Sequence, residues 1–358
     1  MDFDFSPEQY TLRDEARRFL EQQCPTTHVR EFIDDPVGWS SALWKQMAEL
    51  GWMGLPFPED VGGLGQSFLD LVLLLGELGR AVAPVPFLSS VAQAGQVLLR
   101  HGSAAQRERW LPGIASGERV ATLAVAEAAG SYDGAGVSTS FSGGRLTGEK
   151  RYVLDAPIAD LFVVAARDGE RVGWYVVEEG AAVVGQRSYD LTRPIGSVSF
   201  DGVAAEPLEI AGLDPGLRIA TAALTAEMVG TASKILDLSV SYAKEREQFG
   251  RPIGSFQAIK HKCAEMLTDL ESSRSAAFYA CWAVATDAED AALAVAVAKS
   301  YCSDALARLG GEGVQVHGGI AFTWEHDMHL YLKRIKTAEA LFGDAAEHRE
   351  RIAQLAGM

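Results

Sequence analysis

The C-terminal part of the chain carries the feature that most constrains the fold, namely long segments with helical periodicity. Four such segments are predicted at about 216–248, 255–285, 288–309 and 325–355, joined by short connections that contain glycine or proline. Residues 219–232, within the first segment, are apolar on almost every side. Because a helix without a polar face must be covered on every face, we expect these residues to lie between neighbouring helices of a bundle and another subunit.

The residues before this bundle fall into two regions of different texture. From residue 7 to about 117 the apolar residues recur with helical spacing, and Ser6 followed by Pro7 is a typical helix start. From about 118 to 208, short apolar or alternating runs are separated by Gly, Asp and Pro, a pattern typical of strands and turns. We therefore predict an α+β protein, mostly α, with a helical domain at 1–117, a β domain at 118–208 and a four-helix bundle at 209–358.

Composition excludes several classes of protein. The net charge of −16 argues against a reader of the nucleic-acid backbone, which needs a surplus of Lys and Arg. No apolar run reaches the roughly 18 residues that span a bilayer, and the acidic start at residues 1–5 is not a signal peptide. The 4 cysteines are widely spaced, without a C-x-x-C pair, and no metal-ligand spacing is visible. We expect a cytoplasmic protein that binds neither membrane nor nucleic acid.

A glycine-rich run connects the first two predicted bundle helices. It reads Arg-Glu-Gln-Phe-Gly-Arg-Pro-Ile-Gly-Ser-Phe-Gln-Ala-Ile over residues 246–259. On turn chemistry alone, Gly250 ends one helix and Ser255 caps the next. Turn chemistry does not require Arg246, Gln248 or Gln257, so these side chains indicate a function beyond a helix connection.

This run resembles a signature of the acyl-CoA dehydrogenase family. Residues 313–323, Gly-Val-Gln-Val-His-Gly-Gly-Ile-Ala-Phe-Thr, resemble a second signature, and residues 50–65 weakly resemble the family's N-terminal domain. The resemblance covers nearly the whole chain. It implies a helical N-terminal domain, a central β-barrel-like domain and a C-terminal four-helix bundle, assembled as a dimer of dimers with FAD at a subunit interface.

The resemblance also assigns cofactor-binding residues. Arg246 would meet the pyrophosphate of FAD, because a guanidinium offers a planar fork of donors to phosphate oxygens. Glycines would let the backbone approach the dinucleotide closely. The remaining cofactor-binding residues implied by the family pattern are Gln248, Phe249, Gln257, Gln315, Gly318 and Gly319.

The sequence departs from the family at the catalytic base. The family removes the α-proton of an acyl-CoA with a Glu while the β-hydrogen leaves as hydride, which gives the 2-enoyl-CoA. The position of that Glu is Phe342 here, and the alternative position on the first bundle helix is Ala220. Neither side chain accepts a proton, so no catalytic residue is expected on this chain. Glu227, two helical turns after Ala220, is either a displaced base or a buried structural carboxylate.

The segments that face the flavin in the family, at 126–133 and 152–155, are also altered. We therefore expect an FAD-binding subunit whose isoalloxazine pocket and Glu come from a paralogous subunit, in a heterotetramer. Actinobacterial acyl-CoA dehydrogenases that degrade steroids have this arrangement, and residues 79–88 and 341–344 resemble them. The expected substrate is a bulky acyl-CoA, and an electron-transfer flavoprotein is the default acceptor. A self-sufficient homomeric flavoenzyme and a flavin-free structural subunit are the alternatives.

Overall fold

The chain folds into two compact units in the computed structural model, which describes residues 5–35, 37–209 and 212–358. One, the helical unit, comprises residues 1–29, 72–83 and 224–358. The other, the sheet unit, comprises residues 30–71 and 84–223. Most of the acidic start, residues 1–4, lies outside the described residues.

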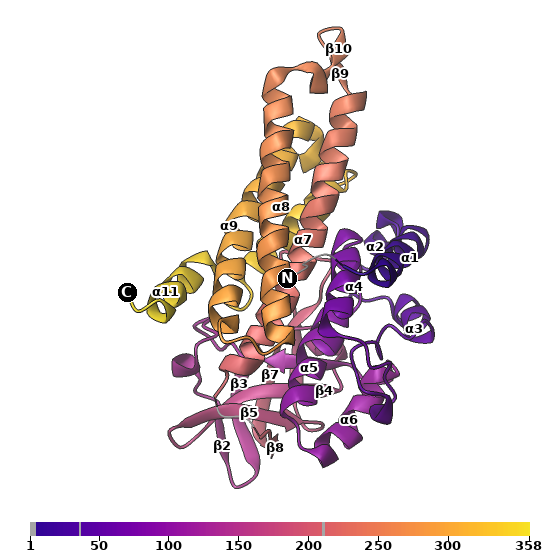
Figure 1. Ribbon diagram of the computed structural model, residues 1–358. Helices are drawn as coiled ribbons and strands as arrows, with labels where there is room; N and C mark the ends of the chain where they lie inside the picture. Colours follow the sequence, from indigo (N-terminus) through magenta and orange to yellow (C-terminus); the bar gives the residue numbers. More distant parts are fainter. Residues whose placement is uncertain (1–4, 36, 210–211) are drawn as a thin grey trace. The chain divides into compact units, whose positions relative to one another are not determined.

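The helical unit consists of long helices (Figure 1). It begins with α1, where Ser6 caps the helix in a capping box and Pro7 occupies the first turn, as predicted. Figure 1 draws α7, α8 and α9 as long neighbouring helices, and α8 and α9 form an extensive mutual contact. The helices that lie wholly or mostly in this unit are α1 (Pro7–Gln23), α2 (Thr26–Glu31), α4 (Phe68–Arg80), α7 (Asp214–Glu245), α8 (Gln257–Ala285), α9 (Ala291–His317), α10 (Met328–Ala340) and α11 (Ala345–Leu355).

Two predicted helix boundaries are wrong. The segment expected as one helix at 325–355 is broken into α10 and α11, because Phe342 and Gly343 adopt positive φ angles of 58° and 96° and Asp344 starts α11 with a capping box. Helix α9 does not end at residue 309 but continues to His317. The glycine at 313 is a packing position, since a Cβ there would lie 2.5 Å from the side chain of Ile235 on α7.

The connection between α7 and α8 is a small hairpin. Strands β9 (Glu247–Gln248) and β10 (Arg251–Pro252) pair antiparallel, and the two residues between them, Phe249 and Gly250, have φ angles of 55° and 76°. Positive φ at both central residues is the geometry of a type I′ turn. Ser255 does not cap α8, because it belongs to a short 3-10 turn (Ile253–Ser255) and Phe256 precedes the helix.

The nearly apolar stretch of α7 is buried as predicted. Every residue from 219 to 232 is buried, although only one chain is present.

The sheet unit contains one eight-stranded sheet in the order β6-β7-β3-β2-β4-β5-β8, with β1 parallel to β4. Among the described residues the end strands β6 and β8 do not pair, so the sheet is open. Helices α3 (Ser41–Glu49), α5 (Gly95–His101) and α6 (Ala104–Ala115) and a π-helical segment (Leu88–Ala94) complete the unit. The strands are β1 (Ala121–Ala124), β2 (Ser140–Ser142), β3 (Arg145–Leu154), β4 (Leu161–Asp168), β5 (Arg171–Val177), β6 (Ala182–Gln186), β7 (Ile195–Ala204) and β8 (Glu206–Pro207).

Candidate functional site

The two sequence motifs meet at one end of the helical unit. Tyr242, near the end of α7, stacks on His317, the last residue of α9, with ring centroids 4.6 Å apart. The β9-β10 hairpin follows α7 directly, and a short 3-10 helix (Gly318–Phe322) follows α9. The hairpin lies at the end of α7 and α8 in Figure 1. Residues far apart in sequence are thus brought to the same end of the bundle.

The side chains of Arg246 and Gln315 at this end do not interact with the part of the chain that the structure describes. Arg246 is fixed through its backbone, whose N–H donates to the Tyr242 carbonyl and whose carbonyl accepts from Ile253, each at 2.8 Å. Its side chain is exposed, as is that of Gln315 on α9. Neither side chain makes a hydrogen bond or ion pair with any residue that the structure describes. An exposed guanidinium with all its donors available suits a diphosphate.

The hairpin side chains are held locally and face solvent. The Gln248 amide donates to the Glu247 carbonyl at 2.8 Å, and the Gln257 amide donates to His261 Nε2 at 3.1 Å. Phe249 is 91% exposed, and its ring lies edge-on to that of Phe256, with centroids 6.0 Å apart. A bulky residue with positive φ and an almost fully exposed ring is unusual, and it indicates that something else covers this surface.

The glycines after α9 leave space for a ligand. Gly318 has φ 68° and ψ −147°, a conformation open essentially to glycine alone. A Cβ on Gly319 would meet no heavy atom within 4 Å. Nothing in the described chain crowds these two residues, so the space before them is open. With the exposed cation, amides and aromatic ring, this donor set fits the ADP half of FAD.

Both positions expected for a catalytic base are apolar and buried. Ala220 is fully buried, and its carbonyl accepts a hydrogen bond of 3.1 Å from the Gln93 side chain. Phe342 is 7% exposed, and its carbonyl accepts from His348 Nε2 at 3.0 Å. No proton acceptor stands at either position.

A buried lysine that the sequence analysis missed holds the turn around Phe342. The Lys299 ammonium is fully buried on α9 and donates to the carbonyls of Gly343 and Glu339, at 2.7 and 2.8 Å, and to the Ser303 hydroxyl at 3.0 Å. Burial lowers the pKa of Lys299 to about 8. Its position on the apolar face of a predicted helix is the sequence feature that could have indicated a buried lysine.

Glu227, the candidate displaced base, is engaged in a buried ion pair. Its Oε1 lies 3.3 Å from Arg334 Nη1, and both side chains are almost fully buried. Arg334 also approaches the Val82 carbonyl at 3.5 Å. A carboxylate paired in this way stabilises a buried cation, which favours the structural interpretation of Glu227.

In the sheet unit, the segments that differ from the family are stabilised by their own polar contacts. Lys150 is fully buried and donates to Glu127 at 2.8 Å and to the Val125 carbonyl at 2.9 Å. Burial alone would raise the pKa of Glu127, but hydrogen bonds from Lys150, Ser138 and Thr139 outweigh it and lower the pKa to about 2. These groups serve the fold of the unit.

No metal site and no membrane-spanning helix is present in residues 5–35, 37–209 and 212–358. They contain no group of three His, Cys, Asp or Glu side chains that could hold a metal ion. None of their helices combines the length and the apolar character that crossing a bilayer requires.

Comparison with known proteins gives matches along the chain. Residues 6–118 match "Acyl-CoA dehydrogenase, N-terminal domain", and residues 216–356 match "Acyl-CoA dehydrogenase, C-terminal domain". The acyl-CoA dehydrogenase IpdE2 of Mycolicibacterium smegmatis is 32% identical, over 97% of this chain and 98% of that protein.

Two solved structures are similar over the full length. A variant of the Tcur3481-Tcur3483 steroid ACAD is 30% identical, with a TM-score of 0.92 over 98% of both chains. The ChsE4-ChsE5 complex from Mycobacterium tuberculosis is 30% identical, with a TM-score of 0.91 over 100% of both chains.

Proposed function

Because this chain belongs to the acyl-CoA dehydrogenase family of FAD-dependent oxidoreductases, we propose that it is the FAD-binding subunit of a heteromeric enzyme, sharing each active site with a paralogous subunit. The observation that carries the proposal is a contrast between two parts of the expected site. The side chains proposed to bind the dinucleotide, those of Arg246, Gln248, Phe249, Gln257 and Gln315, are present and exposed, whereas Ala220 and Phe342 place buried apolar side chains where the family has its base.

The roles of the residues follow from their chemistry. Bound FAD would supply the hydride acceptor for α,β-dehydrogenation of an acyl-CoA to the 2-enoyl-CoA. Arg246 would bind the diphosphate, and Gln248, Gln257 and Gln315 would donate hydrogen bonds along the ADP half. Phe249 would cover the adenosine.

The α-proton of the substrate needs an acceptor within hydrogen-bond reach. This chain provides none at either family position, so a Glu of the partner subunit would take the proton. The names Tcur3481-Tcur3483 and ChsE4-ChsE5 each pair two components, which supports a paralogous partner and a heterotetramer.

The word steroid in the name of one similar structure supports a bulky acyl-CoA substrate, such as a steroid side-chain or ring-fragment thioester. An electron-transfer flavoprotein is the proposed acceptor. The substrate class and the electron acceptor are both proposed from similarity to other proteins. The proposed location of the protein is the cytoplasm.

The alternatives have less support from the contacts. A homomeric enzyme with Glu227 as base would have to break the Arg334 pair and leave a buried cation without its partner, which is costly. A flavin-free scaffold has no need of the exposed, unused donors of Arg246 and Gln315.

The decisive experiment compares this chain purified alone with the chain coexpressed with the paralogue encoded nearest to it. We expect the coexpressed complex to be yellow and to dehydrogenate an acyl-CoA, and we expect the partner's Glu→Gln variant to stay yellow while losing activity. A yellow, active lone chain would refute the shared site, and Glu227→Gln would then test the homomeric alternative.

A further inference from the structure

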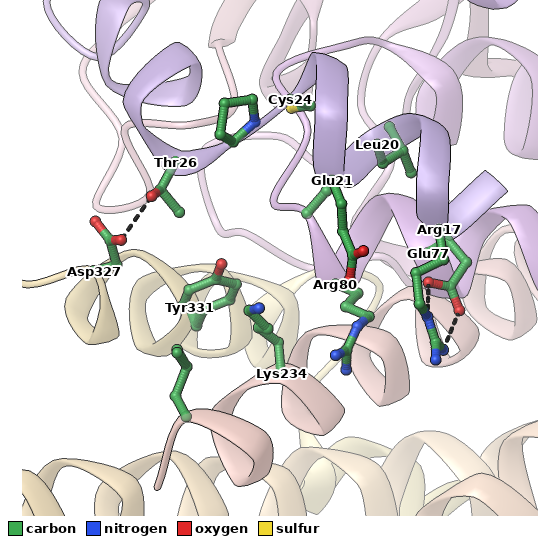
Figure 2. Close-up of a pocket in the computed structure, with 13 residues that line it drawn as sticks. Arg17, Leu20, Glu21, Cys24, Thr26, Glu77, Arg80, Lys234, Asp327 and Tyr331 are labelled. Carbon is green, nitrogen blue, oxygen red and sulfur yellow. Dashed lines mark hydrogen bonds and ion pairs between the residues drawn. The ribbon is translucent and has the colours of Figure 1, made fainter. Parts of the chain in front are cut away.

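A cavity lies inside the helical unit. Its volume is about 270 Å³, and it is lined by residues of α1, α4, α7 and α10 and by the segment after α1 (Figure 2). All these residues belong to the same compact unit. The cavity is near the lower end of the size range of small-molecule sites, so it suits a ligand of a few heavy atoms.

Cations and carboxylates both line this cavity, and one of the cations, Lys234, forms no direct ion pair with a described residue. Arg17 pairs with Glu77 at 2.7 Å, and Arg80 pairs with Asp237 at 2.6 Å. Lys234 on α7 has no ion pair or hydrogen bond with any residue in the described part of the chain. Burial lowers the pKa of Lys234 and repulsion from Arg80 adds to this, while attraction from Glu21, Asp237 and Asp327 acts in the opposite direction. A bound anion beside this ammonium would add to that attraction and favour its charged form.

A buried hydroxyl adds a second unused polar group. Tyr331 on α10 is 2% exposed, and its hydroxyl makes no hydrogen bond with the residues that the structure describes. In Figure 2 the Tyr331 hydroxyl and the Lys234 amine both point toward α1, into the cavity. The hydroxyl is open to the cavity, where a ligand oxygen would accept a hydrogen bond from it.

Most of the other residues that line the cavity are apolar or acidic, and they limit how much negative charge a ligand can carry. Leu20, Cys24 and Leu238 make part of the wall apolar. Asp327 accepts a hydrogen bond from Thr26 at 2.6 Å. The exposed carboxylate of Glu21 has no ion pair with a described residue, and it opposes an anion in the cavity.

We propose that this cavity binds a small oxyanion, either a carboxylate or a phosphate, between the Lys234 ammonium and the Tyr331 hydroxyl, with Arg80 as the neighbouring cation. Glu21 weakens the binding from the opposite side. The site lies beside the flavin end of the bundle, since Leu238 in its lining is hydrogen-bonded to His317, but it uses none of the residues proposed to bind FAD.

The test is calorimetric titration of the full chain, or of its complex if the chain requires a partner, with inorganic phosphate and separately with acetate. All proteins carry Arg246→Met to silence the diphosphate end, and sodium chloride holds the ionic strength constant. Lys234→Met should weaken binding by about tenfold, the effect of losing one charge-assisted hydrogen bond. Tyr331→Phe should weaken it by a smaller factor, and the exposed Lys244→Met on the same helix should leave it unchanged.

Glu21→Gln gives the result that misfolding cannot imitate, because it should tighten binding by a few fold. The probe that binds more tightly identifies the class of anion. Equal binding of phosphate or acetate by the parent, Lys234→Met and Glu21→Gln proteins would overturn the proposal, as would the absence of saturable binding by the parent protein.

Discussion

The variant Lys299→Met should show how much the buried lysine beside the Phe342 turn contributes to the free energy of unfolding. Methionine fills similar space but donates nothing, so the carbonyls of Glu339 and Gly343 lose their donor. Each unsatisfied buried carbonyl costs about 1–3 kcal/mol, while removal of a buried charge offsets part of this loss. We expect the free energy of unfolding at pH 7 to fall by about 1–3 kcal/mol.

The pH dependence separates this explanation from a simple packing defect. The pKa of Lys299 falls from 10.5 in the unfolded chain to about 8 in the folded chain, so between these values only the unfolded chain holds the proton. Folded wild-type protein therefore gains stability as pH rises from 8 to 10.5, by up to about 1.4 kcal/mol per pH unit. The variant lacks this gain, so the difference between the two proteins should widen with pH.

Urea unfolding of both proteins at pH 7, 8, 9 and 10 measures this difference, with Lys244→Met as the control at an exposed lysine. A difference that stays constant across the series would refute the reasoning, because Lys299 would then release its proton equally in both states. Equal stability of variant and wild type at pH 7 would refute the role of the three hydrogen bonds.

Arg246→Met should lower FAD affinity by about tenfold or more. The flavin absorbance of the purified complex measures the FAD that it retains. If the variant retains as much FAD as wild type, Arg246 does not belong to the site. Glu227→Gln should cost about 3–5 kcal/mol in urea unfolding, because it leaves a buried arginine charged and uncompensated; a neutral result would contradict a structural pair. Gly230→Ala should prevent stable folding, since its Cβ would lie 1.8 Å from a backbone oxygen of α4. Gly311→Ala has open space around it and should raise the free energy of unfolding by about 0.5–1 kcal/mol. Thermal unfolding followed by circular dichroism distinguishes the two outcomes. In wild type, the folded-state pKa of about 2 for Glu127 contributes stability that is present above pH 4.5 and lost as pH falls toward 2. In Glu127→Gln, the free energy of unfolding should therefore depend less on pH between 4.5 and 2.

Local sequence patterns predicted which segments are helical better than they predicted where each helix begins and ends. The capping box at Asp344 and Glu347 could have been recognised from the sequence, and it marks the break between α10 and α11. The glycines at 310 and 313 were misleading, because they pack closely against Leu332 and Ile235 inside a continuous helix. Glycine alone does not distinguish a helix end from a close approach of two helices.

The motifs predicted which residues lie at the flavin end, but not the contacts that support the site. Stacking of Tyr242 on His317 brings the two motifs together, and it depends on how α7 packs against α9. Lys299 and Arg334 find their partners 44 and 107 residues away, respectively, at Gly343 and Glu227. Such long-range pairing follows from tertiary packing, which periodicity in one sequence does not encode.

The exposed aromatic residues at the flavin end have a consequence for the cell. Phe249 and Phe322, 91% and 78% exposed, follow α7 and α9 and are the kind of surface that chaperones and proteases recognise. If FAD and a partner subunit cover them, a chain synthesised in excess would remain marked for degradation until it assembles. The two subunits would then be kept in equal numbers by turnover, without matched rates of synthesis.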